Sequence, residues 1–84
     1  MDLTVELSMY PFQADYKTLI KDFIDELNTR KGACRVTTGP TATLLSGSYG
    51  EVWQLLGELL AWSHEKHGRA VFVAKIIPGM LPEA

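Results

Sequence analysis

Apolar residues recur with two different periods along this chain, and the order of those periods is the strongest constraint on its fold. Residues 3–10 alternate strictly between apolar and polar side chains, and the alternation stops at Pro11. A period of two residues predicts a β-strand with one buried face. The apolar face of this strand holds Leu3, Val5, Leu7 and Met9, and the opposite face holds Thr4, Glu6, Ser8 and Tyr10.

A single apolar stripe with helical spacing follows this strand. Asp15 is a typical helix N-cap residue, and Gly32 is typical of the position just after a helix C-terminus. Arg30 and Lys31 suit the negative end of the helix dipole. The spacing therefore predicts a helix between Asp15 and Gly32 with one apolar face. That face consists of Tyr16, Leu19, Ile20, Phe23, Ile24 and Leu27.

Two short β-prone segments come next, at residues 33–38 and 41–46, and Gly39-Pro40 separates them. Such segments, bounded by glycine and proline, are typical of two strands joined by a turn. We therefore predict a hairpin. Alternation along its second strand is expected to place Thr41, Thr43 and Leu45 on the face away from the helices, and Ala42 and Leu44 toward them.

A second helix is predicted between Ser48 and Gly68. Ser48 and Glu51 have the spacing of a capping box, and glycine is a typical helix stop. The apolar residues of this segment cover more than one stripe, and Leu55 and Trp62 belong to the second. We expect this second arc to be exposed on a single chain and to contact a partner. The stripe expected to face the sheet consists of Val52, Leu56, Leu59 and Ser63.

Residues 69–77 form the last β-prone segment, which stops at Pro78-Gly79. The complete order is therefore β-α-β-β-α-β, the split βαβ arrangement. Residues 1–84 are expected to form a single α+β domain, a ferredoxin-like sandwich with a four-stranded antiparallel sheet and two helices on one face. The first and third strands would be central. The uncovered face of the sheet would be free to bind a ligand, a nucleic acid or a second subunit.

Size and cysteine content add two expectations. A chain of 84 residues buries only about 60–65% of its unfolded surface, and the single cysteine, Cys34, cannot form an internal disulfide. Domains of this kind often gain stability by oligomerising, so a homodimer or homotetramer is expected.

One cysteine also excludes Cys-x-x-Cys redox chemistry and fits a reducing cytoplasm. The sequence contains no long apolar segment or basic leader, so neither membrane insertion nor secretion is expected.

The charge balance argues against nucleic acid as a partner. Eight Lys and Arg residues stand against ten Asp and Glu residues, which gives a formal net charge of −2. Binding to phosphates would need a basic patch. An RNA-recognition module would also need aromatic residues on both central strands, and the first strand offers only Tyr10. The segment after that strand, residues 10–16, lacks the arginine and glycine of an acylphosphatase loop.

No catalytic or metal-binding pattern is present. No base is placed to activate a nucleophile, so neither an enzyme activity nor a cofactor is expected. His64 and His67 have helical spacing but no third ligand beside them. Their position near a helix C-terminus, where the dipole favours a cation, is a sufficient explanation.

Polar side chains on the uncovered face suit a small ligand instead. Hydroxyl groups and one carboxylate near an aromatic ring can orient a small polar ring. The same residue types are also common on the wet side of any sheet, so a plain solvated surface is the alternative. Glu6 could pair with Lys75 across two neighbouring strands. The candidate ligand-binding residues are Ser8, Thr43, Glu6, Tyr10 and Thr38.

Three segments together resemble a known family. Ser8-Met9-Tyr10-Pro11, followed by Asp15-Tyr16 at the start of a helix, is similar to the beginning of YkoF-type thiamine/hydroxymethylpyrimidine-binding domains and of related small thiamine-binding proteins. Residues 41–47 resemble the Ser-Thr-x-Leu-x-Gly strand of that family, with Ala42 where the family often has serine. Residues 68–79 resemble its closing strand.

The resemblance implies a ferredoxin-like subunit that associates through its sheet with another copy and binds thiamine or its hydroxymethylpyrimidine moiety without catalysis. Ser8 and Thr43 match the family's contact residues. Glu6 would favour a cationic thiazolium ring, and Tyr10 would offer it a cation–π face. The alternative is a structural or regulatory module that self-associates and binds no small molecule.

Overall fold

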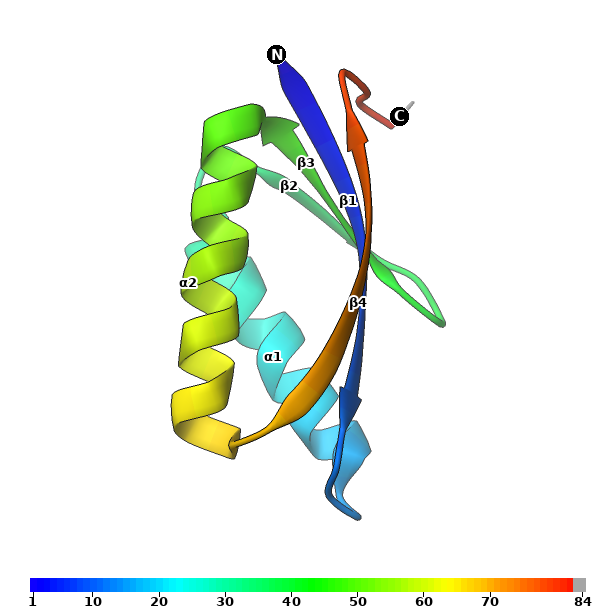
Figure 1. The fold of residues 1–84 in the computed structure, drawn as a ribbon, viewed down its shortest axis with the longest axis vertical. Helices are drawn as coiled ribbons and strands as arrows, with labels where there is room; N and C mark the ends of the chain where they lie inside the picture. The colour runs from blue at the N-terminus through cyan, green and yellow to red at the C-terminus, as the bar shows by residue number, and fades with distance from the viewer. Residues whose placement is uncertain (83–84) are drawn as a thin grey trace.

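The computed structural model describes residues 1–82 and confirms the predicted order of elements (Figure 1). Every predicted helix and strand is present, with the two hairpin strands each beginning two residues later than expected. The elements are β1 (Asp2–Pro11), α1 (Tyr16–Arg30), β2 (Arg35–Thr38), β3 (Thr43–Ser48), α2 (Tyr49–His67) and β4 (Ala70–Pro78).

The four strands form one antiparallel sheet in the order β2-β3-β1-β4, so the first and third strands are central as predicted. Both helices lie on the same side of this sheet, and the other face is uncovered (Figure 1). The fold is therefore the ferredoxin-like α+β sandwich. Within residues 1–82, no helix has the length and apolar character needed to cross a bilayer.

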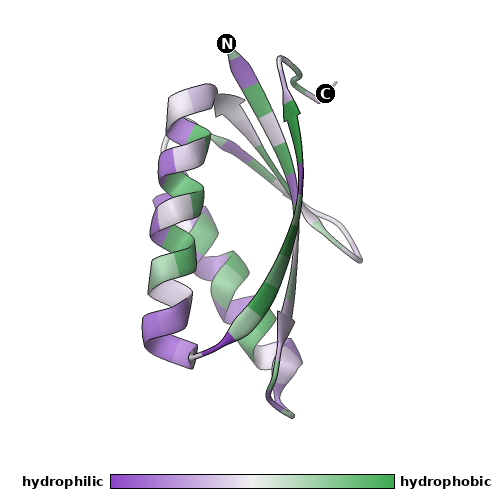
Figure 2. Ribbon diagram, viewed as in Figure 1, coloured by the Kyte–Doolittle hydropathy of each residue, from purple (hydrophilic) through white to green (hydrophobic). Residues whose placement is uncertain are grey.

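The core lies between the helices and β1 and β3. Leu3, Val5 and Leu7 alternate into it from β1, and Val52 and Leu59 enter it from α2. Each such side chain contributes about 1.5–3 kcal/mol by leaving water. Figure 2 shows hydrophobic and hydrophilic positions alternating along both helices and β1, whereas β4 is hydrophobic along most of its length.

The prediction for the second arc of α2 is wrong. Leu55 is only 4% exposed and belongs to the core, and Trp62 is half-buried against it. The reason is that α1 packs against α2 and covers this side of the helix. The aromatic residues that α2 does expose are Tyr49 and Trp53, whose rings meet edge to face at 6.1 Å.

Both helices begin at the predicted N-cap residues, but neither cap bond forms. The side chains of Asp15 and Ser48 make no capping hydrogen bond, so the predicted capping box is absent. At the start of α2 a backbone group takes part instead, since the amide of Tyr49 donates to the Met1 carbonyl across 2.8 Å. Gly68 ends α2 as predicted, with a φ of 81° that favours glycine.

The prediction for the faces of β3 is also wrong. Leu45 pairs with Val5 and Thr43 with Leu7, so both point toward the helices and are buried. Leu44 lies opposite Glu6 on the uncovered face. In this strand apolar residues occur on both faces, so alternation alone could not assign them, and the register with β1 decides.

The residues after β4 fold back over one end of the uncovered face. Gly79 adopts a φ of 80° and its amide donates to the Asp2 carbonyl across 2.7 Å. The Thr4 hydroxyl then donates to the Met80 carbonyl at 2.6 Å and is buried, although its position in β1 predicts a solvated side chain. This end of the face is therefore closed by the chain itself.

Candidate functional site

A cavity of about 120 Å³ opens where β3 stops pairing with β1. The pairing ends at Leu7 and Thr43, whereas β1 continues to Pro11. The connection between β2 and β3 bends away from the sheet at this point (Figure 1), which leaves space between it, β1 and α1. The cavity is lined by Leu7, Ser8, Met9, Ile20, Phe23, Ile24, Gly39, Pro40, Thr41, Ala42 and Thr43.

Two of the predicted ligand-binding residues, Ser8 and Thr43, line this cavity together. They come from different strands, and Thr43 is on the helix side rather than on the uncovered face where we expected it. Both residues can line the cavity because it lies just beyond the last β1–β3 pair, at an edge of β1 that β3 no longer covers. Side chains from either face of the sheet can contact a cavity in this position. The Ser8 hydroxyl donates to the Thr41 carbonyl across 3.1 Å. Among residues 1–82, no hydrogen bond involves the Thr43 hydroxyl.

Helix α1 supplies the apolar wall of the cavity. Ile20, Phe23 and Ile24 recur at helical spacing and face β1 from one side of the helix. The Phe23 ring packs against the ring of Phe72 on β4, with 5.2 Å between the ring centroids. An aromatic and aliphatic wall combined with serine and threonine residues is the composition expected of a site for a small, partly polar ring.

None of the residues that line the cavity is titratable. General acid–base catalysis needs a positioned group that takes up or releases a proton, and the cavity wall contains none. The residues that line the cavity can offer hydrogen bonds and apolar contacts to a ligand.

Glu6 lies on the uncovered face, in a second and shallower hollow of about 220 Å³. This hollow shares Gly39, Thr41 and Ala42 with the first cavity, so the two lie on either side of the β2–β3 connection. The predicted cross-strand pair is confirmed, because Lys75 is directly opposite Glu6 and their charged atoms are 3.9 Å apart. Both side chains are well exposed, so the pair stabilises the fold by at most about 1 kcal/mol.

The remaining two candidates lie outside both hollows. Tyr10 is exposed on β1 opposite Val71 of β4, and Thr38 is exposed at the end of β2 opposite Thr43. Sequence reasoning did not identify the lining from α1 or the Thr41 carbonyl. The apolar stripe of α1 was visible in the sequence, but the point at which β3 leaves β1 was not.

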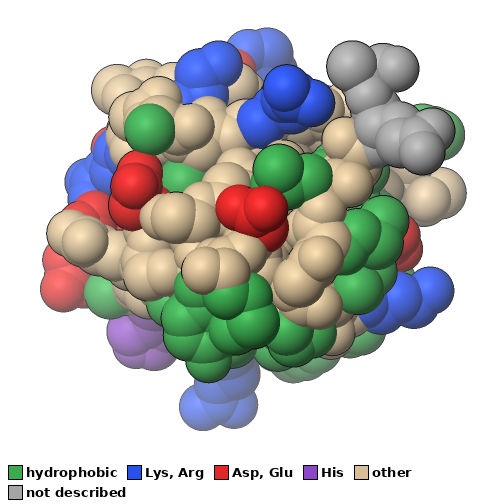
Figure 3. All heavy atoms as spheres, turned by 90° about the horizontal axis from the view of Figure 1, so that it is seen from above, with side chains coloured by type: hydrophobic (Ala, Val, Ile, Leu, Met, Phe, Trp, Pro, Cys, Tyr) green, Lys and Arg blue, Asp and Glu red, His purple; other side chains and the backbone are tan. Residues whose placement is uncertain are grey.

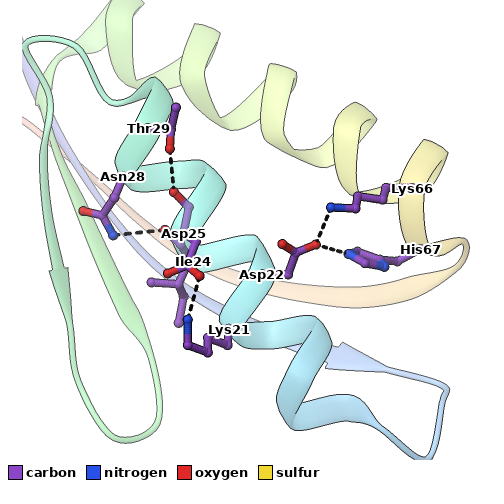
Figure 4. Close-up of polar contacts among 8 residues, drawn as sticks. All are labelled: Lys21, Asp22, Ile24, Asp25, Asn28, Thr29, Lys66 and His67. Carbon is purple, nitrogen blue, oxygen red and sulfur yellow. Dashed lines mark hydrogen bonds and ion pairs between the residues drawn. The ribbon is translucent and has the colours of Figure 1, made fainter.

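The histidine near the end of α2 has a structural role (Figure 4). Nε2 of His67 lies 2.6 Å from Oδ2 of Asp22 on α1, and Nζ of Lys66 lies 2.9 Å from the same oxygen. The hydrogen bonds from Lys66 and then His67 are the main reasons why the pKa of Asp22 is lowered. Lys66 also stands over the Trp62 ring, 5.1 Å from its centroid. This cluster joins the two helices.

The part of the chain that the structure describes contains no group of three His, Cys, Asp or Glu side chains able to hold a metal ion. Cys34 is buried just before β2, and burial, with a smaller effect of Glu51, raises the pKa of its thiol. A raised thiol pKa disfavours the nucleophilic thiolate.

No family model matches the sequence, and a search of curated proteins finds no match. Solved structures do match. A candidate thiamine biosynthesis/salvage protein from Thermotoga maritima superposes with a TM-score of 0.77 at 20% identity, over 90% of this chain and 82% of that one. Protein SP2199 from Streptococcus pneumoniae gives a TM-score of 0.83 at 23% identity, over 96% and 90%.

A domain of unknown function, DUF77, from Bacillus cereus gives a TM-score of 0.73 at 16% identity, over 92% of this chain and 75% of that one. These proteins share the fold. At such identities the likeness extends to the arrangement of helices and strands and not to the residues of the site.

Proposed function

We propose that this protein binds thiamine or its hydroxymethylpyrimidine moiety, without catalysis, in the cavity between β1, α1 and the β2–β3 connection. The observation that carries the proposal is that Ser8 and Thr43 both line a cavity that also has an apolar wall and contains no titratable side chain. Such a cavity suits a neutral ring with a few hydrogen-bonding atoms better than it suits a charged group.

The hydrogen-bonding groups complement an aminopyrimidine, which has ring nitrogens that accept and an exocyclic amine that donates. The Ser8 hydroxyl already donates to the Thr41 carbonyl, so its oxygen is left to accept a hydrogen bond from the amine. The Thr43 hydroxyl is left to donate to a ring nitrogen. The faces of the ring would pack against Phe23 and its aliphatic neighbours on α1.

The size of the cavity indicates how much of the ligand it holds. A volume of about 120 Å³ is below the range of about 300–1,000 Å³ that encloses drug-sized ligands. We therefore place the pyrimidine ring inside and the cationic thiazolium ring at the surface. Glu6 and the net charge of −2 would attract that cation, and Tyr10 would offer it an aromatic face.

Two likenesses support this choice of ligand. The Ser8-Met9-Tyr10-Pro11 segment, which resembles the thiamine-binding family, contributes two residues to the cavity wall. The Thermotoga maritima protein, a candidate for thiamine biosynthesis or salvage, has the same fold. We propose a role in the salvage, transport or sensing of the vitamin on this basis.

Calorimetric titration separates this proposal from a module that only self-associates. Hydroxymethylpyrimidine and thiamine are titrated into the protein, with choline as a cation that has no pyrimidine. The proposal predicts saturable heat with both pyrimidines and none with choline. Equal responses to thiamine and choline would indicate a general cation surface, and no response to either pyrimidine would refute the proposal.

A further inference from the structure

A further cavity, which we call the C-terminal cavity, lies beside the segment that follows β4. Its volume is about 360 Å³, and its walls come from the residues around the start of β2, from β3 and from that segment. It shares no residue with the two hollows on either side of the β2–β3 connection. The lining consists of Ala33, Arg35, Ser46, Gly47, Leu81 and Pro82.

Three side chains from neighbouring strands form a row on the uncovered face at this cavity. Ser46 of β3 is directly opposite Thr4 on β1 and directly opposite Arg35 on β2. Because Leu45 points toward the helices, Ser46 points to the uncovered face, and residues directly opposite each other share a face. The Thr4 hydroxyl donates to the Met80 carbonyl at 2.6 Å and so holds the segment after β4 beside this row.

The two polar side chains of this row that line the cavity have no partner in the part of the chain that the structure describes. Ser46 is only 3% exposed, yet its hydroxyl makes no hydrogen bond among residues 1–82. The Arg35 guanidinium is exposed and forms no ion pair within the same residues. A buried hydroxyl without a partner is costly, so a hydrogen-bonding group from outside the chain is favoured at this position.

A single positive charge beside apolar walls determines what this cavity can bind. Arg35 is the only charged residue of the lining, and Ala33, Leu81 and Pro82 supply apolar surface. Figure 3, which views the molecule from above, shows Lys and Arg side chains gathered along one border of this end. A guanidinium can bind both oxygens of a carboxylate, and a neighbouring serine hydroxyl can donate a further hydrogen bond to it.

We propose that the C-terminal cavity binds a small monocarboxylate with a short apolar body, independently of the pyrimidine site. The carboxylate pairs with Arg35 and accepts a hydrogen bond from Ser46, and the apolar body lies against Leu81 and Pro82. A volume of about 360 Å³ is within the range of about 300–1,000 Å³ that is typical of small-molecule sites. A phosphate group, with nearly two negative charges, fits less well because no second basic residue lines the cavity.

An NMR titration with butyrate tests the site. Sodium butyrate replaces sodium chloride at constant ionic strength, and the backbone amide signals of the isotope-labelled protein are followed. We expect saturable shifts at Arg35, Ser46, Gly47 and Leu81, with an affinity in the millimolar range because the ion pair is partly exposed. Butanol has a similar apolar body without the charge and should bind about ten-fold more weakly or not at all. Inorganic phosphate should also bind more weakly than butyrate.

Two arginine substitutions separate a built site from general attraction of anions. Arg35→Gln changes an exposed side chain, so the fold should persist, and the affinity for butyrate should fall about ten-fold or more. Arg69→Gln is the matched control, because Arg69 is also exposed but precedes β4, whereas Leu81 follows it, and affinity should not change. No saturable shift at these amides, binding of butanol or phosphate as tight as that of butyrate, or equal affinities for butyrate in Arg35→Gln and Arg69→Gln would overturn the proposal.

Discussion

The hydroxyl of Ser8 donates a hydrogen bond to the carbonyl oxygen of Thr41 across 3.1 Å. This bond connects β1 to the β2–β3 connection just beyond the last pair of the β1–β3 ladder, Leu7 and Thr43. It therefore fixes the polar side of the cavity while leaving the lone pairs of the serine oxygen available to a ligand. Under the proposed function, Ser8 would both hold the β2–β3 connection in place and accept a hydrogen bond from the ligand.

Replacing Ser8 with alanine should weaken pyrimidine binding more than it weakens the fold. The loss of one hydrogen-bond partner for a buried ligand atom costs about 1–3 kcal/mol, so affinity for hydroxymethylpyrimidine should fall about five-fold or more. The bond to Thr41 is exposed, so the free energy of unfolding should drop by no more than about 1 kcal/mol. Calorimetry and urea denaturation measure the two effects, and an unchanged affinity would remove Ser8 from the site.

Replacing Phe23 with alanine should damage the protein severely. The side chain is buried against Phe72 and forms part of the cavity wall, so truncation should reduce the free energy of unfolding by about 3–5 kcal/mol. Phe12→Ala is the matched control, because that ring is 66% exposed and its loss should change stability by less than about 0.5 kcal/mol. Equal effects in urea denaturation would contradict the burial that the structure assigns.

The free energy of unfolding should decrease in acid, partly because Asp22 becomes protonated. Its pKa is lower in the folded state than in the unfolded chain, because Lys66 and His67 hydrogen bond to the carboxylate. This contribution is complete above the unfolded pKa of about 3.9 and is lost as pH falls through the lower folded pKa. Asp22→Asn should therefore be less stable than wild type at neutral pH.

The difference between wild type and Asp22→Asn should shrink in urea denaturation below about pH 4. Asp2→Asn is the control, because no ion pair of Asp2 occurs among residues 1–82. A difference for Asp22→Asn that stays constant from neutral pH down to about pH 2 would show that the carboxylate charge does not join the helices.

Replacing Ser48 with alanine should have almost no effect on stability. A serine that caps a helix through its side chain contributes about 1 kcal/mol, but Ser48 makes no such bond and the Tyr49 amide is satisfied by Met1. The midpoint of urea denaturation should therefore shift little. A loss of about 1 kcal/mol would show that the capping box predicted from Ser48 and Glu51 forms in solution.

The sequence is sufficient to predict the architecture because the strong periodic signals agree with one another. Leu3, Val5 and Leu7 alternate cleanly in β1, and the stripe of Leu19, Phe23 and Leu27 gives α1 a single buried face. Gly32 and Gly68, both at positive φ, follow the ends of the two helices. Local pattern and global fold agree at these positions, so few other arrangements remain.

The details of the site could not be predicted because they depend on relationships between elements. The faces of β3 follow from its register with β1, and the adjacent leucines Leu44 and Leu45 give no local signal. The burial of Leu55 follows from where α1 crosses α2. The cavity exists because β1 continues to Pro11 after its pairing with β3 has ended at Leu7. The length of this pairing depends on both strands together, so neither segment alone predicts it.

The affinity of the protein for hydroxymethylpyrimidine, compared with that of Thr43→Val, tests the central claim most directly. The threonine is buried and its hydroxyl makes no hydrogen bond among residues 1–82, so valine keeps the shape and stability of the site and removes only the donor. Calorimetry should show saturable binding to wild type, an affinity about five-fold or more lower for Thr43→Val, and no change for Thr37→Val on the surface of β2. Equal affinities for wild type and Thr43→Val, or no binding to wild type, would contradict the account.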